Sequence, residues 1–375
     1  MKSDNDILII GGGIIGCSIA WRLAQQKARV TVIEKGEPGL EASWAAAGML
    51  APQSESAHGL RDAMSALCYA SHALYPEFID ELQAASGVNI GYRTTGSIYL
   101  AADFNEAEAL AGLVERQLTA GRRAEELSHQ QLHEMEPALT SNIEAAIFLP
   151  DDHHVDNRAL MKALVSAGSA VGVKFLNHTQ VVGLVVKHDR AAGLRTATGV
   201  LECDKVINAA GCWAGVVETG NRLKLPLRPI RGQIVCLEMQ PQPLHHLIHS
   251  AGCYLVPWPD GRILVGATLE NAGFDKRVTA AGVQQLLAAA IKSVPALASA
   301  SMRDTWAGLR PDTPDNLPIL GETAIANLFA ATGHFRNGIL LAPITAKLVS
   351  EVVLSGESPV SLGAFRPQRF ENQNG

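Results

Sequence analysis

A glycine-rich turn near the start of the chain has the residue types and spacing that hold a dinucleotide pyrophosphate. Gly11, Gly13 and Gly16 follow the apolar segment 7–10 with the spacing G-x-G-x-x-G, and a helical pattern comes after them. Gly11 permits a tight turn, Gly13 lacks the Cβ that would keep a pyrophosphate from the backbone, and Gly16 lets the helix lie close to the strand. The free N–H groups at the start of that helix would face the phosphates. The turn therefore predicts a dinucleotide site.

An acidic residue lies where a ribose would be bound. A second apolar strand, 30–33, ends on Glu34, 18 residues after Gly16. A carboxylate here accepts hydrogen bonds from an adenosine ribose and disfavours a 2′-phosphate, so NAD or FAD is preferred over NADP. The alternative is a structural turn, because the chain has 34 glycines. Strand, glycines, helix, strand and acid occur in order, which favours the cofactor site.

Two further segments are candidates for the same site. Small residues fill 43–51, where Ser43 could reach a phosphate; an ordinary alanine-rich helix start is the alternative. Near the C-terminus, a strand over 328–331, a turn over 332–338 and a helix over 339–354 repeat the strand, glycine and helix order. The start of that second helix would stabilise the negative charge of a reduced flavin.

Histidines and cysteines indicate no metal site. His153 and His154 are adjacent in a loop between acids, where side chains diverge and no third ligand has a usable spacing, so a solvated turn is preferred. His245, His246 and His249 are expected in an exposed loop. The six cysteines form no C-x-x-C pair and are predicted to be buried free thiols: Cys17, Cys68, Cys203, Cys212, Cys236 and Cys253.

The remaining pattern predicts the elements that must position these segments. Helices are expected at 61–85, 106–119, 128–135, from Asp156 or Asn157 to about 172, and at 279–293. Strands are expected as a pair within 92–100 turned at 94–96, at 145–149, 173–176, 181–187, a buried parallel strand at 206–211, and antiparallel hairpins between 225 and 268. Residues after 355 are expected to form a surface tail.

Length and composition limit the class of protein. A chain of 375 residues exceeds what one core usually supports, so two domains are expected. With 47% hydrophobic residues, 18% charged residues and a net charge of −6 without a basic block, the chain should fold and should not bind nucleic acid. Asp4 and Asp6 occupy the place where a signal peptide needs positive charge. No segment reaches the about 18 apolar residues of a membrane span, and a cytoplasmic location is expected.

The chain resembles the D-amino acid oxidase group of FAD amine oxidases, and within it the bacterial glycine oxidases linked to thiamine biosynthesis. The motifs that carry the resemblance span nearly the whole chain and are residues 9–16, 45–50, 253–257, 306–311 and 333–343. The resemblance implies a Rossmann-like FAD-binding domain of the glutathione-reductase type, in an α/β protein with an antiparallel-sheet α+β substrate-binding domain. We expect the FAD-binding domain at 1–85, 145–220 and 305–365, and the substrate-binding domain at 86–144 and 221–304.

The resemblance also implies roles for single residues. FAD contacts are implied at Ile14, Ile15, Glu34, Lys35, Ala42, Ser43, Ala47, Gly48, Met49 and Val181, and around the flavin at His334, Phe335, Arg336, Asn337, Gly338, Ile339 and Leu340. Arg310 is implied to bind the substrate carboxylate, assisted by Tyr254 and Arg336. No acid or base catalyst is implied, because hydride passes from substrate to flavin. FAD should be non-covalent, since segment 311–318 lacks the cysteine by which sarcosine oxidases attach it.

A guanidinium suits this task, because it presents two parallel N–H donors to a carboxylate and stays charged at any working pH. The alternative for Arg310 is a surface salt bridge, and for Tyr254 an aromatic side chain of the core. The implied substrates are glycine, sarcosine or small D-amino acids, with O₂ as acceptor. Leu269, Gly252 and Ala51 replace family residues that shape the pocket, which leaves the choice among these substrates open.

Three other functions remain possible from the sequence. One is an FAD-dependent D-amino acid dehydrogenase with a quinone acceptor, the second is a demethylating enzyme like sarcosine oxidase, and the third is a non-catalytic flavin-binding subunit. The resemblance implies a homo-oligomer, a tetramer in this family.

Overall fold

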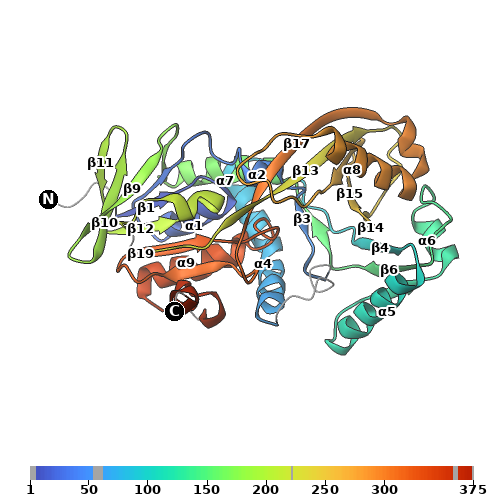
Figure 1. Ribbon diagram of the computed structural model, residues 1–375, viewed down its shortest axis with the longest axis horizontal. Helices are drawn as coiled ribbons and strands as arrows, with labels where there is room; N and C mark the ends of the chain where they lie inside the picture. Colours follow the sequence, from blue (N-terminus) through green and yellow to red (C-terminus); the bar gives the residue numbers. More distant parts are fainter. Residues whose placement is uncertain (1–5, 54–61, 221–222, 358–361, 374–375) are drawn as a thin grey trace.

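The computed structural model describes residues 6–53, 62–220, 223–357 and 362–373 of the chain. Two large sheets organise these residues and lie toward opposite ends of an elongated molecule (Figure 1). This mixed α/β architecture confirms the predicted fold class, with a Rossmann-type sheet at one end and a largely antiparallel sheet at the other.

The Rossmann-type sheet has six strands in the order β18-β19-β12-β1-β2-β8. These strands are β18 (Ile319–Glu322), β19 (Leu328–Thr332), β12 (Lys205–Asn208), β1 (Ile7–Ile10), β2 (Val30–Ile33) and β8 (Lys174–Leu176). All pair in parallel except the edge strand β18. Every residue of β1 and β2 is buried, as expected for a parallel sheet covered on both faces. The predicted strands at 7–10, 30–33 and 328–331 are confirmed. The strand predicted at 206–211 is confirmed as far as Asn208, and Gly211 begins a short helix instead.

Four helices share one hydrophobic core with this sheet: α1 (Ile14–Gln25), α4 (Asp62–Ser86), α7 (Asn157–Ala170) and α9 (Ala342–Ser355). The predicted cap of α7 is confirmed, because the Asp156 carboxylate accepts the N–H groups of Arg158 and Ala159, both at 3.0 Å. Helix α9 begins at Ala342, three residues later than predicted. Residues 339–341 belong instead to the turn that precedes it.

The second sheet has eight strands in the order β17-β13-β16-β15-β14-β4-β6-β5. These are β17 (Ser301–Asp312), β13 (Arg228–Glu238), β16 (Arg262–Gly266), β15 (Cys253–Pro257), β14 (Leu247–Ser250), β4 (Ser97–Ala101), β6 (Ala145–Leu149) and β5 (Glu125–Leu127). Helices α6 (His129–Met135) and α8 (Ala280–Ser293) pack against it in a second core, and α5 (Phe104–Thr119) packs in a third. The predicted hairpins and these three helices are confirmed.

The smaller elements complete the chain. Strands β9 (Val181–Lys187), β10 (Arg190–Thr196) and β11 (Gly199–Glu202) form an antiparallel sheet, and β3 (Met49–Leu50) pairs with β7 (His153–His154). Short helices are α2 (Ala42–Ala45), η1 (Gly211–Val216), η2 (Pro295–Ser299), η3 (Gly363–Phe365) and η4 (Pro367–Gln373). All six cysteines are buried thiols that form no disulfide with one another, as predicted.

Three local predictions were wrong. The expected strand pair within 92–100 is a single strand, β4, because its partners are β6 and β14, while Arg93 forms an isolated bridge with His154. His154 lies in β7, which pairs with β3, and it is completely buried with its ring centroid 5.0 Å from that of Trp258, so it is not in a solvated turn. The C-terminal segment is not a surface tail, because Leu362, Phe365 and Phe370 are buried.

The expectation of an exposed loop for the second histidine group is confirmed for His245 and wrong for His246 and His249. His249 lies within strand β14, where its ring stacks on Tyr99 with centroids 4.2 Å apart. The side chain of His246 is mostly buried, and its Nδ1 lies 2.8 Å from a carboxylate oxygen of the buried Glu136. The sequence around these histidines gives no sign of these partners, which come from strand β4 and the end of α6.

The division into two domains stays a prediction. By sheet membership, β6 and all of β17 belong with the eight-stranded sheet.

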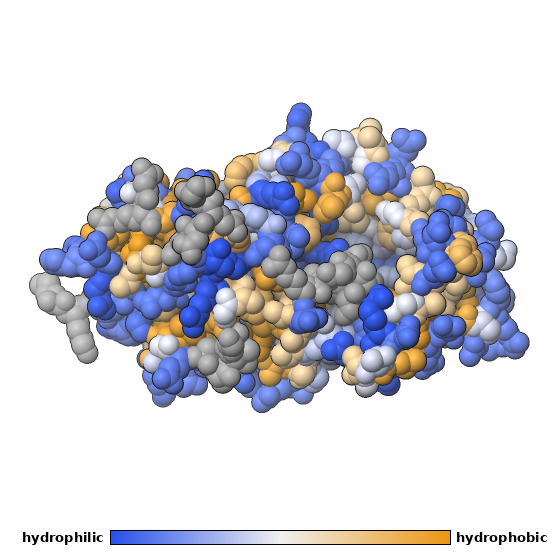
Figure 2. Space-filling view, turned by 60° about the horizontal axis from the view of Figure 1, so that its bottom comes forward, coloured by the Kyte–Doolittle hydropathy of each residue, from blue (hydrophilic) through white to orange (hydrophobic). Residues whose placement is uncertain are grey.

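Hydrophilic and hydrophobic side chains are interspersed over the face of the molecule in Figure 2. Among the described residues, none of the helices has the length and apolar composition needed to span a bilayer.

Candidate functional site

A cavity of about 940 Å³ is lined by residues of both large sheets. It collects segments that are far apart in the sequence, from the glycine-rich turn, the start of α2, the end of β12, β15, β17 and the turn before α9. Every predicted substrate and cofactor residue lines this cavity except Gly16. The structure therefore brings together what the sequence analysis had to infer from separate motifs.

The glycine-rich turn has the geometry that its spacing predicts. Gly11 has a φ of +100°, and a Cβ there would lie 2.6 Å from the Ala209 carbonyl oxygen. Gly16 packs against the Gly11 carbonyl, where any Cβ would collide, so its role is close contact between helix and strand. At Gly13 the nearest atom to a Cβ is Ser43 Oγ at 3.3 Å. Gly13 thus leaves its side of the turn open to the cavity.

The N-terminus of α1 faces this opening. Its N-cap residue is Gly13, which has no side chain to accept the N–H groups of the first turn. Ser43 Oγ accepts the Ile14 N–H at 2.9 Å, so the hydroxyl proton of Ser43 is free to be donated into the cavity. Residues of the first turn have N–H groups that the helix itself does not satisfy. Together with the helix dipole, they suit an anionic group at this point, so the residues present fit the phosphates of a dinucleotide.

Glu34 fixes the turn from the neighbouring strand. One carboxylate oxygen accepts the Gly12 N–H at 2.8 Å and the other accepts the Gly36 N–H at 2.9 Å. The carboxylate also lines the cavity. Next to it, Lys35 Nζ lies 3.2 Å from the centroid of the Trp213 ring and 3.4 Å from Glu41. The ribose contact of Glu34 remains a prediction.

The segment 42–49 forms another wall of the cavity. Asn157 Nδ2 donates to the carbonyl oxygens of Ser43 at 2.6 Å and Trp44 at 3.1 Å. Gly48 has a φ of +80°, and a Cβ there would collide with the Val155 carbonyl. From the sequence, Asn157 is expected only as a possible helix cap. Its position directly after that cap gave no sign that it holds the cofactor segment.

Two side chains of α4 donate hydrogen bonds to backbone carbonyls of the turn 334–340. Ser71 Oγ donates to the Leu340 carbonyl at 2.6 Å, and the Tyr75 hydroxyl donates to the Ile339 carbonyl. His334 is buried, and its Nε2 lies 3.0 Å from Thr345 Oγ1. Burial lowers the pKa of His334 to about 3, so the imidazole is neutral at physiological pH.

This histidine should make the folded state sensitive to acid. Its pKa falls from the usual 6.5 to about 3, so below pH 6.5 the unfolded chain binds a proton that the folded chain does not. Stability is therefore present above pH 6.5 and is lost as the pH falls toward 3. In urea titrations, the free energy of unfolding of the unchanged protein should fall between pH 7 and about pH 5. The fall in His334→Gln should be smaller by about 2 kcal/mol. An identical pH dependence in the two proteins would contradict this assignment.

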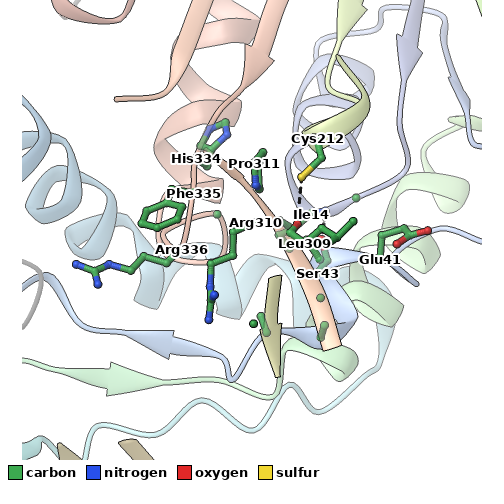
Figure 3. Close-up of a pocket in the computed structure, with 18 of the residues that line it drawn as sticks. Ile14, Glu41, Ser43, Cys212, Leu309, Arg310, Pro311, His334, Phe335 and Arg336 are labelled. Carbon is green, nitrogen blue, oxygen red and sulfur yellow. Dashed lines mark hydrogen bonds between the residues drawn. The ribbon is translucent and has the colours of Figure 1, made fainter. Parts of the chain in front are cut away.

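Arg310 and Tyr254 line the cavity from two strands of the eight-stranded sheet, β17 and β15, which are separated by β13 and β16. Arg310, on β17, donates from Nη1 to the Thr268 carbonyl at 3.1 Å. Burial lowers the pKa of its guanidinium and raises the pKa of the Tyr254 phenol, while the attraction between the two groups opposes both shifts. In Figure 3 the Arg310 side chain extends away from the turn that carries His334. The Arg310 guanidinium presents charged N–H donors to a carboxylate, and Tyr254 presents a phenol hydroxyl.

Two glycines that the sequence analysis did not select make this arrangement possible. A Cβ at Gly232 would collide with the Arg310 guanidinium, and one at Gly266 would collide with the Tyr254 ring. Both lie inside strands, on β13 and β16. A glycine in a strand interior often marks a close approach by another group, and that is the signal that could have identified them.

Arg336 lines the same cavity but differs from Arg310 in exposure. It lies in the turn before α9 and is exposed, whereas Arg310 is partly buried. In Figure 3 its guanidinium points in a different direction from that of Arg310. Its predicted contact with substrate stays a prediction.

No cluster of three or more histidine, cysteine or acidic side chains with the geometry of a metal site exists among the described residues.

Comparisons with known proteins agree with this geometry. The bifunctional protein ThiO/ThiG of Trichormus variabilis is 37% identical over 372 residues, which cover 98% of this chain and 55% of that protein. The chain thus spans about half the length of these bifunctional relatives. Glycine oxidase of Pseudomonas putida is 34% identical over 364 residues, covering 96% of this chain and 98% of that protein.

A solved structure and a family profile extend the likeness to the fold. The crystal structure of glycine oxidase from Geobacillus kaustophilus superimposes with a TM-score of 0.92 at 36% identity, covering 97% of this chain and 98% of that one. The family described as FAD dependent oxidoreductase, DAO, matches residues 6–352. The match covers both the α1 turn and the turn before α9. The chain therefore belongs to the DAO family of FAD-dependent oxidoreductases, and its cofactor is FAD.

Proposed function

We propose that this protein is an FAD-dependent amino acid oxidase whose first substrate is glycine and which also accepts sarcosine and small D-amino acids. The observation that carries the proposal is the position of Arg310, whose guanidinium shares one cavity with the glycine-rich turn and the turn before α9. The glycine oxidases among its relatives support the choice of substrate. The reaction yields the 2-oxo acid, ammonia or amine, and hydrogen peroxide from O₂.

The side chains act by binding and orientation. Arg310 binds the substrate carboxylate through two parallel N–H donors, and Tyr254 adds a hydroxyl donor, which fixes the amino acid in one pose. The Thr268 carbonyl keeps the guanidinium in place before substrate arrives. FAD, when bound, supplies the acceptor for the hydride of the α-carbon. No side chain has to remove that hydrogen as a proton, so no general base is assigned.

The proposal includes the use of the product. The imine formed from glycine would supply thiamine thiazole synthesis, and the ThiO/ThiG relatives support this role. A homo-oligomer is proposed from the same resemblance, and light scattering tests it. FAD is proposed to be non-covalent, which denaturation followed by filtration tests, because free flavin should pass the filter.

Anaerobic titration of the FAD-loaded protein tests the proposed function. Glycine should bleach the flavin absorbance, and readmitted air should restore it with formation of peroxide. Bleaching without peroxide, with turnover restored by an artificial acceptor, would identify a dehydrogenase that uses a quinone. Bound FAD that no amino acid bleaches would identify a non-catalytic flavin-binding subunit. Bleaching by sarcosine alone would favour a demethylating enzyme.

Tyr254→Phe should raise KM for glycine by about tenfold, because one hydrogen bond to a charged group is lost. FAD binding and kcat should change much less, since the ring still fills its place beside Gly266. Tyr69→Phe is the matched control: its hydroxyl donates to Gln117 at 2.9 Å and it does not line the cavity. Equal effects of the two substitutions would remove Tyr254 from the substrate site.

A further inference from the structure

A second cavity of about 180 Å³ adjoins the segment 42–49 that forms the cofactor wall, since Ala46 lines both cavities. Three arginines reach it from three elements: Arg158 from the start of α7, Arg262 from β16 and Arg303 from β17. Trp258 and Trp306 form aromatic walls. The cavity is separate from the proposed substrate site, and none of its arginines has a role in the proposed reaction.

Arg158 is the unusual member of this group. Its guanidinium carbon lies 3.6 Å from the centroid of the Trp44 ring and 4.6 Å from that of Trp306, so the group packs against two indoles. Its Nε donates to the Trp44 carbonyl at 3.4 Å. Its Nη2 is buried and has no hydrogen-bond partner among the described residues. Within that part of the chain, no carboxylate lies within 4.0 Å of this guanidinium.

The other two arginines already have carboxylate partners. Arg262 lies 2.6 Å from Asp260 and 3.6 Å from Asp156, and Arg303 lies 3.3 Å from Glu238. Asp304 also lines the cavity, and its Oδ1 accepts the Thr305 N–H at 2.8 Å. Of the three arginines, Arg158 is therefore the one that the described side chains leave without a direct ion pair. The carboxylates of Asp156 and Asp304 also line the cavity, and their attraction opposes the lowering of the Arg158 pKa by burial.

We propose that this cavity binds a small tetrahedral oxyanion such as inorganic phosphate, with Arg158 Nη2 as its central donor. A buried N–H of a charged group that lacks a partner costs free energy, and an oxyanion in the adjacent space would remove that cost. The space is large enough for one such ion and too small for a nucleotide. Arg303, half-exposed at the side of the cavity, would supply further positive charge.

The bound anion would be coupled to FAD. Ala46 lines both cavities, and Arg158 and Asn157 together hold the Ser43 and Trp44 carbonyls of the cofactor segment. An anion that fixes the Arg158 guanidinium therefore restrains the wall against which FAD packs. Because coupling between two ligands is reciprocal, phosphate should tighten FAD binding by the same factor by which FAD tightens phosphate binding.

Calorimetric titration of the FAD-loaded protein with sodium phosphate tests the site, with sodium chloride at equal ionic strength as reference. We expect saturable binding of one phosphate, and a weakening of about tenfold or more in Arg158→Met. Arg277→Met is the matched control, because that side chain is 87% exposed, pairs with Asp275 and lies outside both cavities. It should bind phosphate like the unchanged protein.

Several outcomes would overturn the proposal. These are absence of saturable binding, equal affinity in Arg158→Met, and tighter binding of acetate than of phosphate, which would identify a carboxylate site. A phosphate site that leaves the dissociation constant of FAD unchanged would disprove the coupling. Should Arg158→Met fail to fold, crystals of the unchanged holoenzyme soaked in selenate decide the matter. An anomalous peak beside Arg158 would support the site, and its absence would overturn it.

Discussion

Arg310→Ala is expected to lower kcat/KM for glycine by about 100-fold to 1,000-fold while the protein keeps its FAD. Removing one partner of a buried, hydrogen-bonded charge pair costs about 3 to 4 kcal/mol, and here the unpaired partner is the substrate carboxylate. Most of the loss should appear in KM, because the carboxylate is bound equally before and during hydride transfer. Peroxide formation at several glycine concentrations measures the two constants.

Two further variants sharpen this test. Arg310→Lys keeps the charge but not the two parallel donors, so it should recover only part of the lost activity. Arg195→Ala removes an exposed arginine that pairs with Glu218 on the small antiparallel sheet, and it should behave like the unchanged protein. An unaltered kcat/KM in Arg310→Ala would exclude Arg310 from the substrate site and leave only the cofactor assignment.

The parts of the site that sequence predicted well are those that local chemistry dictates. A turn needs Gly11 because its φ is positive, and the helix needs Gly16 because a side chain would strike a backbone carbonyl. Such requirements depend on neighbours within a few residues, and spacing reveals them. Short apolar runs separated by turn residues likewise predicted β13, β15 and β16, because hairpin spacing is local.

The parts that sequence missed depend on partners far along the chain. Gly232 matters because Arg310, 78 positions later, lies over it, and the register of β13 with β17 decides that contact. Asn157 looked like a helix cap until the structure placed it against the Ser43 carbonyl. His154 and His249 were misplaced for the same reason: their rings contact Trp258 and Tyr99, whose positions only the tertiary fold sets.

Gly13→Val is expected to give a folded protein that binds FAD about 100-fold more weakly. The Cβ of residue 13 would have Ser43 Oγ as its nearest neighbour at 3.3 Å, so the folded chain accommodates it with little movement. The rest of the valine side chain would extend into the cavity, into the space that a pyrophosphate needs against the N-terminus of α1. Loss of those contacts is worth about 3 kcal/mol. Flavin fluorescence during reconstitution of the FAD-free protein measures the dissociation constant.

Gly16→Val, in the same turn, should behave in the opposite way and so serves as its control. Its side chain would strike the Gly11 carbonyl, and Gly16 does not line the cavity, so the loss should appear as reduced stability of the whole protein. Urea unfolding without FAD separates the two effects: the midpoint should fall in Gly16→Val and stay nearly constant in Gly13→Val. If Gly13→Val bound FAD as tightly as the unchanged protein, the pyrophosphate would have to lie elsewhere, because the open side of the turn would then be filled by the valine while FAD was bound.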